Sequence, residues 1–250
     1  MFDLELHKEF RKRQYQHPNP LNKSKFFGFS QNEEDGITIE ILKRIGLTSG
    51  TFVEFGVGDG TENNTIILLA DGWKGSWFGG QDIALDTSRS SRLSFTKTWI
   101  TKENIVDLYK SAGAASEVIS LDLDGNDIYF VEELLKSGAE PQLFIVEYNA
   151  KFPPSIRFQI PYNDKHTWGY DDYFGASLRS FCDLFEKYGY MLVCCNISGA
   201  NAFFVRNSCR EKFSDVPTTL DEIYSEPFYF SRHRKMHPTS VETVQLLIEG

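Results

Sequence analysis

The chain has 250 residues, of which 41% are hydrophobic and 24% charged, and this composition is typical of a globular domain. Its 21 Phe, 11 Tyr and 4 Trp can build a large core, which excludes disorder as the main state. The apolar runs are far shorter than the ~18–20 residues of a membrane span, and the charged N-terminus lacks the apolar stretch of a secretory signal. The four cysteines form no C-x-x-C pair. We therefore expect a cytoplasmic protein that does not enter a membrane.

The formal net charge is −9, and the negative charge lies in the body of the chain, because residues 1–26 carry six Lys and Arg against three Asp and Glu. A nucleic-acid-binding protein needs a basic face to displace counterions from phosphates. We therefore expect no nucleic-acid partner and a small-molecule partner instead. The basic clusters at residues 11–13 and 232–235 are either solvated charge or a means of steering an anionic substrate such as a sugar phosphate. The sequence does not indicate an oligomeric state.

Predicted helices and strands alternate along most of the chain. Residues 1–30 are polar, with a breaker at His17–Pro20, and are expected to be irregular. Helices are then predicted at residues 35–45, 61–71, 103–112, 128–137 and 178–188. Strands are predicted at residues 51–55, 75–79, 96–100, 117–121, 142–146, 191–195 and 202–205. This order predicts an α/β fold, a Rossmann-like, mostly parallel sheet with helices on both faces and an antiparallel C-terminal edge strand.

A glycine-rich loop follows the first predicted strand and reads Glu54-x-Gly56-x-Gly58-x-Gly60. Glycines here permit positive φ angles and let a ligand approach the backbone. The dinucleotide fingerprint G-x-G-x-x-G fits poorly, because Thr61 stands where its third glycine would fall. The spacing is that of the first motif of class I S-adenosylmethionine-dependent methyltransferases. The loop therefore indicates a cofactor site, and the alternative is a tight β-to-α turn without a ligand.

Several further segments, in the same order along the chain, resemble the FkbM-like methyltransferases found among bacterial polysaccharide-modification proteins. The matching segments are residues 30–36, 52–56, 72–75, 119–127, 145–149, 188–193 and 201–205. The resemblance implies S-adenosylmethionine as the methyl donor, with Gln31 and Glu54 near its methionine end and Asp122 or Asp124 at the centre of the site. It also implies a methyltransferase-like domain at residues 30–210, a lead-in at 1–29 and an extension at 211–250 packed on the domain.

The end of the second predicted strand departs from this pattern. Relatives often carry an acidic residue there that binds the ribose hydroxyls, but this chain has Gly79 and Gln81. Asp82, displaced along the chain, is the remaining cofactor-binding candidate. A glutamine can accept hydrogen bonds only through its carbonyl oxygen, which is a weaker match to two hydroxyls.

Four acidic residues, Asp122, Asp124, Asp127 and Glu147, lie at the ends of two further predicted strands and are expected to converge. Three interpretations stay open. The first is contact with the nucleoside together with capping of the following helix. The second is a divalent cation such as Mg²⁺ held by Asp124, Asp127 and Glu147. The third is general-base catalysis by Asp124.

Residues 150–175 have no clear periodicity but are rich in aromatic side chains, and we interpret them as a lid over the substrate, here named the lid segment. Arg157 or Lys165 could hold a phosphate group. His166 is the only histidine between His17 and His233 in the sequence, and it is either a general base or an ordinary surface or packing histidine.

The predicted function is S-adenosylmethionine-dependent O-methylation of a sugar or phosphorylated small metabolite in surface-glycan synthesis. The alternative is a non-catalytic protein that binds a nucleotide or cofactor and has lost the chemistry of the fold. A nicotinamide oxidoreductase is disfavoured by Thr61.

Overall fold

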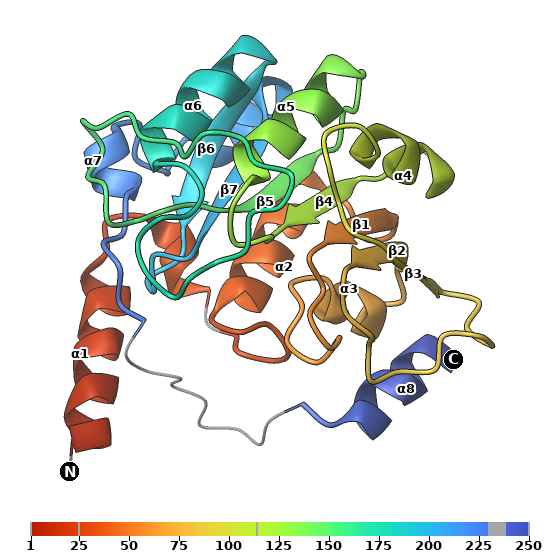
Figure 1. Cartoon of the computed structure of the whole chain (residues 1–250). Coiled ribbons are helices and arrows are strands. Elements are labelled where there is room, and N and C mark those ends of the chain that lie inside the picture. Colours follow the sequence, from red (N-terminus) through yellow and green to blue (C-terminus); the bar gives the residue numbers. More distant parts are fainter. Residues whose placement is uncertain (1, 25, 114, 230–238, 250) are drawn as a thin grey trace.

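The computed structural model describes residues 2–24, 26–113, 115–229 and 239–249. A seven-stranded sheet forms its centre, with the strand order β3-β2-β1-β4-β5-β7-β6 (Figure 1). The strands are β1 (Thr51–Phe55), β2 (Lys74–Gly79), β3 (Leu93–Lys97), β4 (Val118–Leu121), β5 (Leu143–Glu147), β6 (Tyr190–Cys195) and β7 (Asn201–Arg206). The pairs among β1 to β5 are parallel, and β7 is antiparallel to both β5 and β6. The predicted α/β fold with a mostly parallel sheet is therefore confirmed.

The antiparallel strand differs from the prediction in one detail. β7 lies between β5 and β6, so the edge on this side is β6, the first strand of the C-terminal hairpin. The hairpin folds back so that its second strand pairs with β5. β7 therefore has a strand partner on both sides, and β6 forms the edge of the sheet.

Helices cover both faces of the sheet. The α-helices are α1 (Phe2–Gln16), α2 (Glu34–Ile45), α3 (Ile66–Ala70), α4 (Ile105–Ser111), α5 (Asp127–Lys136), α6 (Leu178–Lys187), α7 (Leu220–Ile223) and α8 (Val241–Glu249), and the 3₁₀ helices are η1 (Pro20–Lys23) and η2 (Asn207–Phe213). Figure 1 shows α4, α5 and α6 on one face, with α2 and α3 on the other. Within the described ranges, no helix has the length and apolar character needed to span a membrane.

Three local predictions were wrong. Residues 2–16 form α1 rather than an irregular lead-in: ion pairs such as Glu5–Lys8 and Glu9–Arg13 support the helix locally, and Phe10 is buried against Phe27 and Phe228. The third strand occupies residues 93–97 rather than 96–100. The helix predicted at 61–71 is confined to α3, because the peptide groups before it are bound to Glu54 instead of continuing a helix.

The core is built from the nearly continuous apolar strands that a parallel sheet requires. Its aromatic centre is Phe185 of α6, which stacks on Phe204 at 4.0 Å between ring centroids and contacts Phe144 at 5.1 Å. All three side chains are fully buried. This packing fixes α6, and with it the end of the lid segment, against the sheet.

Replacing Phe185 with alanine should therefore remove contacts with both strands and leave a cavity. We expect Phe185→Ala to lower the free energy of unfolding by about 3–5 kcal/mol, measured by urea denaturation. Tyr188→Ala, at the partly exposed end of the same helix, should cost about 1 kcal/mol or less. Equal losses for the two variants would contradict this description of the core.

Candidate functional site

The carboxyl ends of three adjacent parallel strands lie in register at one edge of the sheet. Phe55 of β1 pairs with Leu121 of β4, and Leu121 pairs with Val146 of β5. The residues that follow these three in the chain are Gly56, Asp122 and Glu147, respectively. The pairing alone therefore brings the glycine loop beside two of the carboxylates, at the edge where ligands bind in open α/β sheets.

The three loop glycines have positive φ angles, at 92° for Gly56, 52° for Gly58 and 86° for Gly60. At Gly56 a Cβ atom would lie 1.7 Å from the carbonyl oxygen of Asp122, so only glycine allows β1 and β4 to end this close together. At Gly58 a Cβ atom would meet nothing within 4 Å. The loop therefore turns tightly at its base and presents free backbone at its tip.

Glu54 shapes this loop from below. Its buried carboxylate accepts hydrogen bonds from the backbone N–H groups of Asn64 (3.0 Å) and Thr65 (3.2 Å), and from the Thr65 hydroxyl. The indole N–H of Trp77 donates to that hydroxyl in turn, at 2.8 Å. Burial raises the pKa of Glu54 to about 7, and these hydrogen bonds limit the rise. Glu54 thus orders residues 61–65 after the loop.

A second set of buried carboxylates lies at the start of α2 and was not singled out from the sequence. Asp35 accepts the backbone N–H groups of residues 28, 29 and 30, and Glu34 accepts side-chain amides of Asn196 and Asn201. Glu33 accepts the N–H of Ser198, and burial raises its pKa to about 8. Gln31, predicted to lie near the cofactor, is exposed on the loop that precedes these residues. The sequence feature that could have identified these carboxylates is the run of three acidic residues at 33–35, at the start of a predicted helix.

The end of β2 offers no carboxylate toward the glycine loop. A Cβ atom at Gly79 would lie 3.1 Å from Val57, and one at Gly80 would lie 3.2 Å from the ring of Trp99. The side chain of Asp82 is 85% exposed and forms an ion pair with Lys97 at 2.7 Å. Two glycines and the exposed indole of Trp99 therefore stand at the end of β2, where relatives often carry an acidic residue.

Three carboxylates converge at the strand ends: Asp122, Asp124 and Glu147 each place an oxygen within 4.8 Å of the others. Oε2 of Glu147 is buried and has no hydrogen-bond partner. Asp124 has a φ angle of 54°, an unfavourable conformation for a residue with a side chain. Burial and the neighbouring carboxylates raise the pKa of both Asp122 and Glu147. Negative charges this close together repel one another, and the repulsion is relieved by protonation of a carboxylate or by a bound cation.

Asp127, predicted as a metal ligand, stands apart from this group. It is fully buried at the start of α5, where one oxygen accepts the N–H of Leu123 at 2.9 Å and the other accepts the N–H of Gly125 at 3.1 Å. Both oxygens are therefore occupied in closing the loop that carries Asp124. The residue that joins Asp124 and Glu147 in the group is Asp122.

The lid segment places His166 against the same loop. A Cβ atom at Gly125 would lie 2.2 Å from Cδ2 of the imidazole, so the ring packs directly on the loop backbone. Nε2 of His166 is buried without a hydrogen-bond partner. Burial raises the pKa of Asp124, and the electrostatic interaction with the neighbouring His166 opposes this with a smaller effect. The structure thus brings together the two residues predicted to be catalytic.

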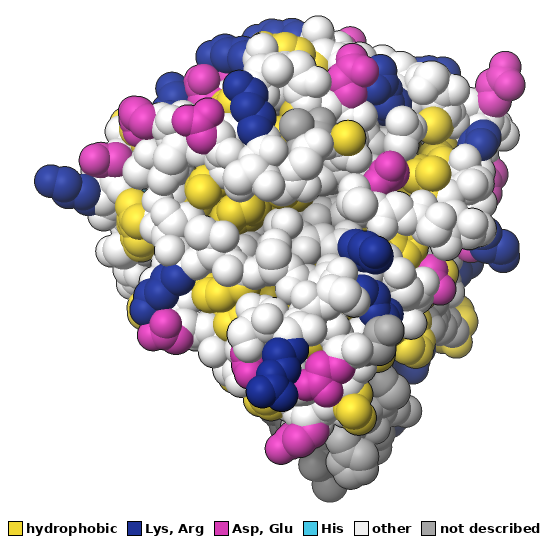
Figure 2. Space-filling view, turned by 90° about the vertical axis from the view of Figure 1, so that its right-hand side faces the viewer, with side chains coloured by type: hydrophobic (Ala, Val, Ile, Leu, Met, Phe, Trp, Pro, Cys, Tyr) yellow, Lys and Arg dark blue, Asp and Glu magenta, His cyan; other side chains and the backbone are white. Residues whose placement is uncertain are grey.

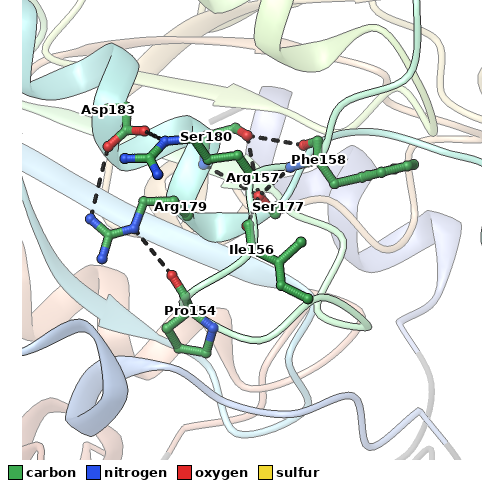
Figure 3. A network of polar contacts seen from close by, with 8 residues as sticks. All are labelled: Pro154, Ile156, Arg157, Phe158, Ser177, Arg179, Ser180 and Asp183. Atoms are coloured by element: carbon green, nitrogen blue, oxygen red, sulfur yellow. Dashed lines mark hydrogen bonds and ion pairs between the residues drawn. The ribbon is translucent and has the colours of Figure 1, made fainter.

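Hydrogen bonds on both sides hold the lid segment in place. Asn126 and Asn163 exchange two hydrogen bonds, at 2.8 and 3.3 Å, and the indole N–H of Trp99 donates to the carbonyl of Asp164 at 2.7 Å. Figure 3 shows the other anchor, in which Arg157 binds Asp183 of α6 and Arg179 binds the carbonyl of Pro154. Arg157 is therefore engaged with α6.

A hollow of about 600 Å³ lies between α5, α6 and residues 157–159. A smaller one of about 270 Å³ lies at the amino ends of β1 and β2. Neither includes the glycine loop or the three carboxylates. On the face drawn in Figure 2, acidic and basic side chains are interspersed.

The sequence matches no family model and no curated protein. Among solved structures, MycE methyltransferase of the mycinamycin pathway, determined with Mg, SAH and mycinamycin VI, is 11% identical, with a TM-score of 0.47 over 80% of this chain. This chain covers 54% of that protein, about half its length.

Two other similar structures are an O-methyltransferase family protein from Burkholderia thailandensis and the methyltransferase domain of bacterial CtHen1. The first is 12% identical, with a TM-score of 0.40 over 80% of this chain and 70% of the other. The second is 18% identical, with a TM-score of 0.43 over 70% of this chain and 97% of the other. At these values the likeness adds nothing to the strand order already described.

The buried carboxylates predict how stability depends on pH. The folded-state pKa values of Glu54 (about 7) and Glu33 (about 8) lie above their ordinary value of 4.5. The folded chain therefore holds protons that the unfolded chain releases, and stability is greatest below the ordinary pKa and is lost as the pH rises through 7 to 8.

We expect the free energy of unfolding to fall between about pH 5 and about pH 8. Glu33→Gln, which cannot ionise, should remove part of this fall, on the order of 2 kcal/mol. The control Glu211→Gln changes an exposed side chain and should leave the slope unchanged. Urea denaturation across this pH range measures it, and an unchanged slope in Glu33→Gln would contradict the assignment.

Proposed function

We propose that this protein is an S-adenosylmethionine-dependent methyltransferase that methylates a hydroxyl group of a small acceptor. The observation that carries the proposal is the juxtaposition, at one sheet edge, of a glycine loop with open space at its tip and a cluster of three carboxylates in which Oε2 of Glu147 has no hydrogen-bond partner. The first feature suits a cofactor and the second suits the reacting end of an acceptor. The four described cysteines are free thiols, which fits a cytoplasmic enzyme.

The glycine loop supports the cofactor assignment. Gly58 leaves room at the tip of the loop for the methionine part of the cofactor, and Gly56 lets the loop lie directly against Asp122. The nucleoside would extend toward the end of β2, over Gly79 and Gly80 and beside the exposed indole of Trp99. An aromatic face there can stack on a base, although the carboxylate for the ribose hydroxyls is missing.

Asp122, Asp124 and Glu147 fit a hard divalent cation such as Mg²⁺, which takes carboxylate oxygens as ligands. The buried, unpartnered Oε2 of Glu147 is the observation that supports a ligand rather than a purely structural cluster. A bound Mg²⁺ would supply Lewis-acid activation of the acceptor hydroxyl. Asp127 would act by fixing the loop that carries Asp124.

His166 supports a proton-transfer role. Its Nε2 has no hydrogen-bond partner and is packed on the loop that carries Asp124. An acceptor hydroxyl bound beside this loop, in line with the methyl group, would release its proton there. Trp168, Tyr170 and Tyr173 add exposed aromatic faces to the same segment. These faces suit the ring of a sugar, so we place the acceptor among sugars or phosphorylated metabolites of surface-glycan synthesis.

The second candidate is a non-catalytic cofactor-binding protein. The ion pair of Asp82 with Lys97 favours it, because no carboxylate is then free for the ribose. Cofactor binding without methyl transfer to any acceptor in a panel of nucleotide sugars and phosphorylated sugars would support this candidate.

Two glycines give a matched test of the cofactor site. Gly58 and Gly72 both have positive φ angles and open space where a Cβ atom would lie, but Gly72 is in the turn before β2, at the opposite edge of the sheet. Alanine should strain the backbone at both positions, by about 1 kcal/mol or more, and at least as much at Gly72 as at Gly58. We expect Gly58→Ala to weaken S-adenosylhomocysteine binding at least about tenfold and Gly72→Ala to leave it unchanged.

Isothermal titration calorimetry of the two variants and the wild-type protein measures this difference. Equal affinities in Gly58→Ala and wild type would remove the glycine loop from the site.

The carboxylate cluster is tested by titration with Mg²⁺ and Mn²⁺. We expect Asp124→Asn and Glu147→Gln each to weaken cation binding at least about tenfold, because each variant removes a charged ligand. Asp71→Asn, which changes an exposed carboxylate after α3, is the control and should bind like wild type. Cation binding that is indifferent to Asp124 and Glu147 would refute the metal site.

A further inference from the structure

The C-terminal helix α8 packs on the same region of the fold that carries the glycine loop. Val244 and Ile248 are fully buried, and α8 contacts α3, the helix that follows the glycine loop in the chain. In Figure 1, α8 lies beneath α3, beside the connection that leads from β2 to β3. The proposed reaction assigns no role to this helix.

Gln245 binds that connection through a reciprocal pair of hydrogen bonds. Its side-chain oxygen accepts the backbone N–H of Asp86 at 3.0 Å, and its side-chain N–H donates to the carbonyl of Asp86 at 2.8 Å. An amide side chain satisfies both backbone groups of one residue here, as a neighbouring strand would. Residue 86 is thereby fixed to α8, although it belongs to no helix or strand.

Ser90 makes a second tie. Its hydroxyl donates to the carbonyl of Ile248 at 2.6 Å and accepts the backbone N–H groups of Arg92 and Leu93 at 3.1 and 2.9 Å. The hydroxyl thus connects the last turn of α8 to the first residue of β3. Residues 83–92 are here named the β2–β3 connection. Gln245 binds its first half at Asp86, and Ile248 binds its second half at Ser90.

The β2–β3 connection in turn supports the glycine loop. The N–H of Ala84 donates to the carbonyl of Asp59 at 2.8 Å. A Cβ atom at Gly60 would lie 3.4 Å from Leu85 and 3.5 Å from Ile83, so these side chains are in contact with the loop. Leu85 is buried under this contact. A continuous series of direct contacts therefore runs from Gln245 through Asp86 and Leu85 to Gly60.

Such a series matters because a loop with three positive-φ glycines is costly to order. Fixing the backbone of a residue costs conformational entropy, and glycine loses the most freedom. A loop that is ordered before its ligand arrives spares the ligand that cost, which appears as higher affinity. The two ties to α8 order the β2–β3 connection, which has no secondary structure of its own between residues 80 and 92.

We propose that α8 acts as a brace that preorganises the glycine loop, with Gln245 as the positioning residue, and that it thereby sets the affinity for the cofactor. The inference rests on the proposed function for the identity of the ligand. Its structural part, the ordering of the loop by α8, is independent of that identity.

The test uses the full chain with Gln245→Ala, which cuts the first tie, and Ser90→Ala, which cuts the second. Because Ser90→Ala also removes the acceptor of the Arg92 and Leu93 N–H groups, Gln245→Ala is the decisive variant. Leu246→Ala is the control in the same helix, because Leu246 is 71% exposed. Arg44→Ala is a second control that removes ion pairs with Glu40 and Asp215 at the far end of α2. Amide hydrogen exchange of the cofactor-free protein is read over residues 56–65 and 81–92, and S-adenosylhomocysteine affinity is measured by calorimetry.

We expect faster exchange in both segments for Gln245→Ala and Ser90→Ala, and cofactor binding at least about fivefold weaker. Both controls should keep wild-type exchange in these segments and wild-type affinity, whatever their effect on melting temperature. Faster exchange confined to α8, with unchanged residues 56–65, would overturn the proposal. If wild-type protein binds no S-adenosylhomocysteine, the proposed function fails, and the exchange of residues 56–65 still decides whether α8 orders the loop.

Discussion

The close approach of Gly56 to the backbone carbonyl of Asp122 is the contact on which the candidate site depends. A Cβ atom at residue 56 would lie 1.7 Å from that oxygen, so any other residue would force β1 and β4 apart at their carboxyl ends. The approach places the glycine loop against one carboxylate, and the register of β4 with β5 adds Glu147 beside it. A cofactor loop and an acidic cluster thus become neighbours through strand pairing.

Two kinds of carboxylate surround this contact, and they differ in how their charge is satisfied. Glu54, Asp35 and Asp127 are buried and accept backbone N–H groups from the loops around them, so each one fixes a segment of chain. Asp122 and Glu147 are half-buried and Asp124 is exposed, and these three lack such a set of donors and face one another instead. Within this group Oε2 of Glu147 is buried without a hydrogen-bond partner, which is unfavourable. That atom supports the proposal of a ligand at the strand ends, whereas the first kind of carboxylate supports the scaffold.

Much of the fold follows from local pattern in the sequence. Apolar runs bounded by Gly46, Gly56 or Gly189 predict the strands and helices, and their alternation predicts the parallel sheet. The position of β7 between β5 and β6 could not be predicted, because it depends on which hairpin strand pairs with β5, a contact between residues far apart in the sequence. The short length of α3 could not be predicted either, because the backbone N–H groups of residues 64 and 65 each donate a hydrogen bond to Glu54 across the loop.

The candidate site could be predicted as a region, but the partition of roles within it could not. Sequence spacing placed Asp122, Asp124, Asp127 and Glu147 at two strand ends, yet only the side-chain directions separate Asp127, which closes its own loop, from the other three. The meeting of His166 with Gly125, and the series of contacts from Gln245 to Gly60, join residues far apart in the chain. No local pattern carries such contacts.

In the proposed site the methyl group of the cofactor and a cation held by the carboxylates would meet at the same sheet edge. The most direct measurement is the NMR line width of ¹³C-methyl S-adenosylmethionine bound to the protein with Mn²⁺, compared with Mg²⁺ as the diamagnetic control. The account predicts strong paramagnetic broadening of the methyl signal with Mn²⁺ that is lost in Glu147→Gln. A bound cofactor whose methyl signal is equally sharp with both cations would contradict it.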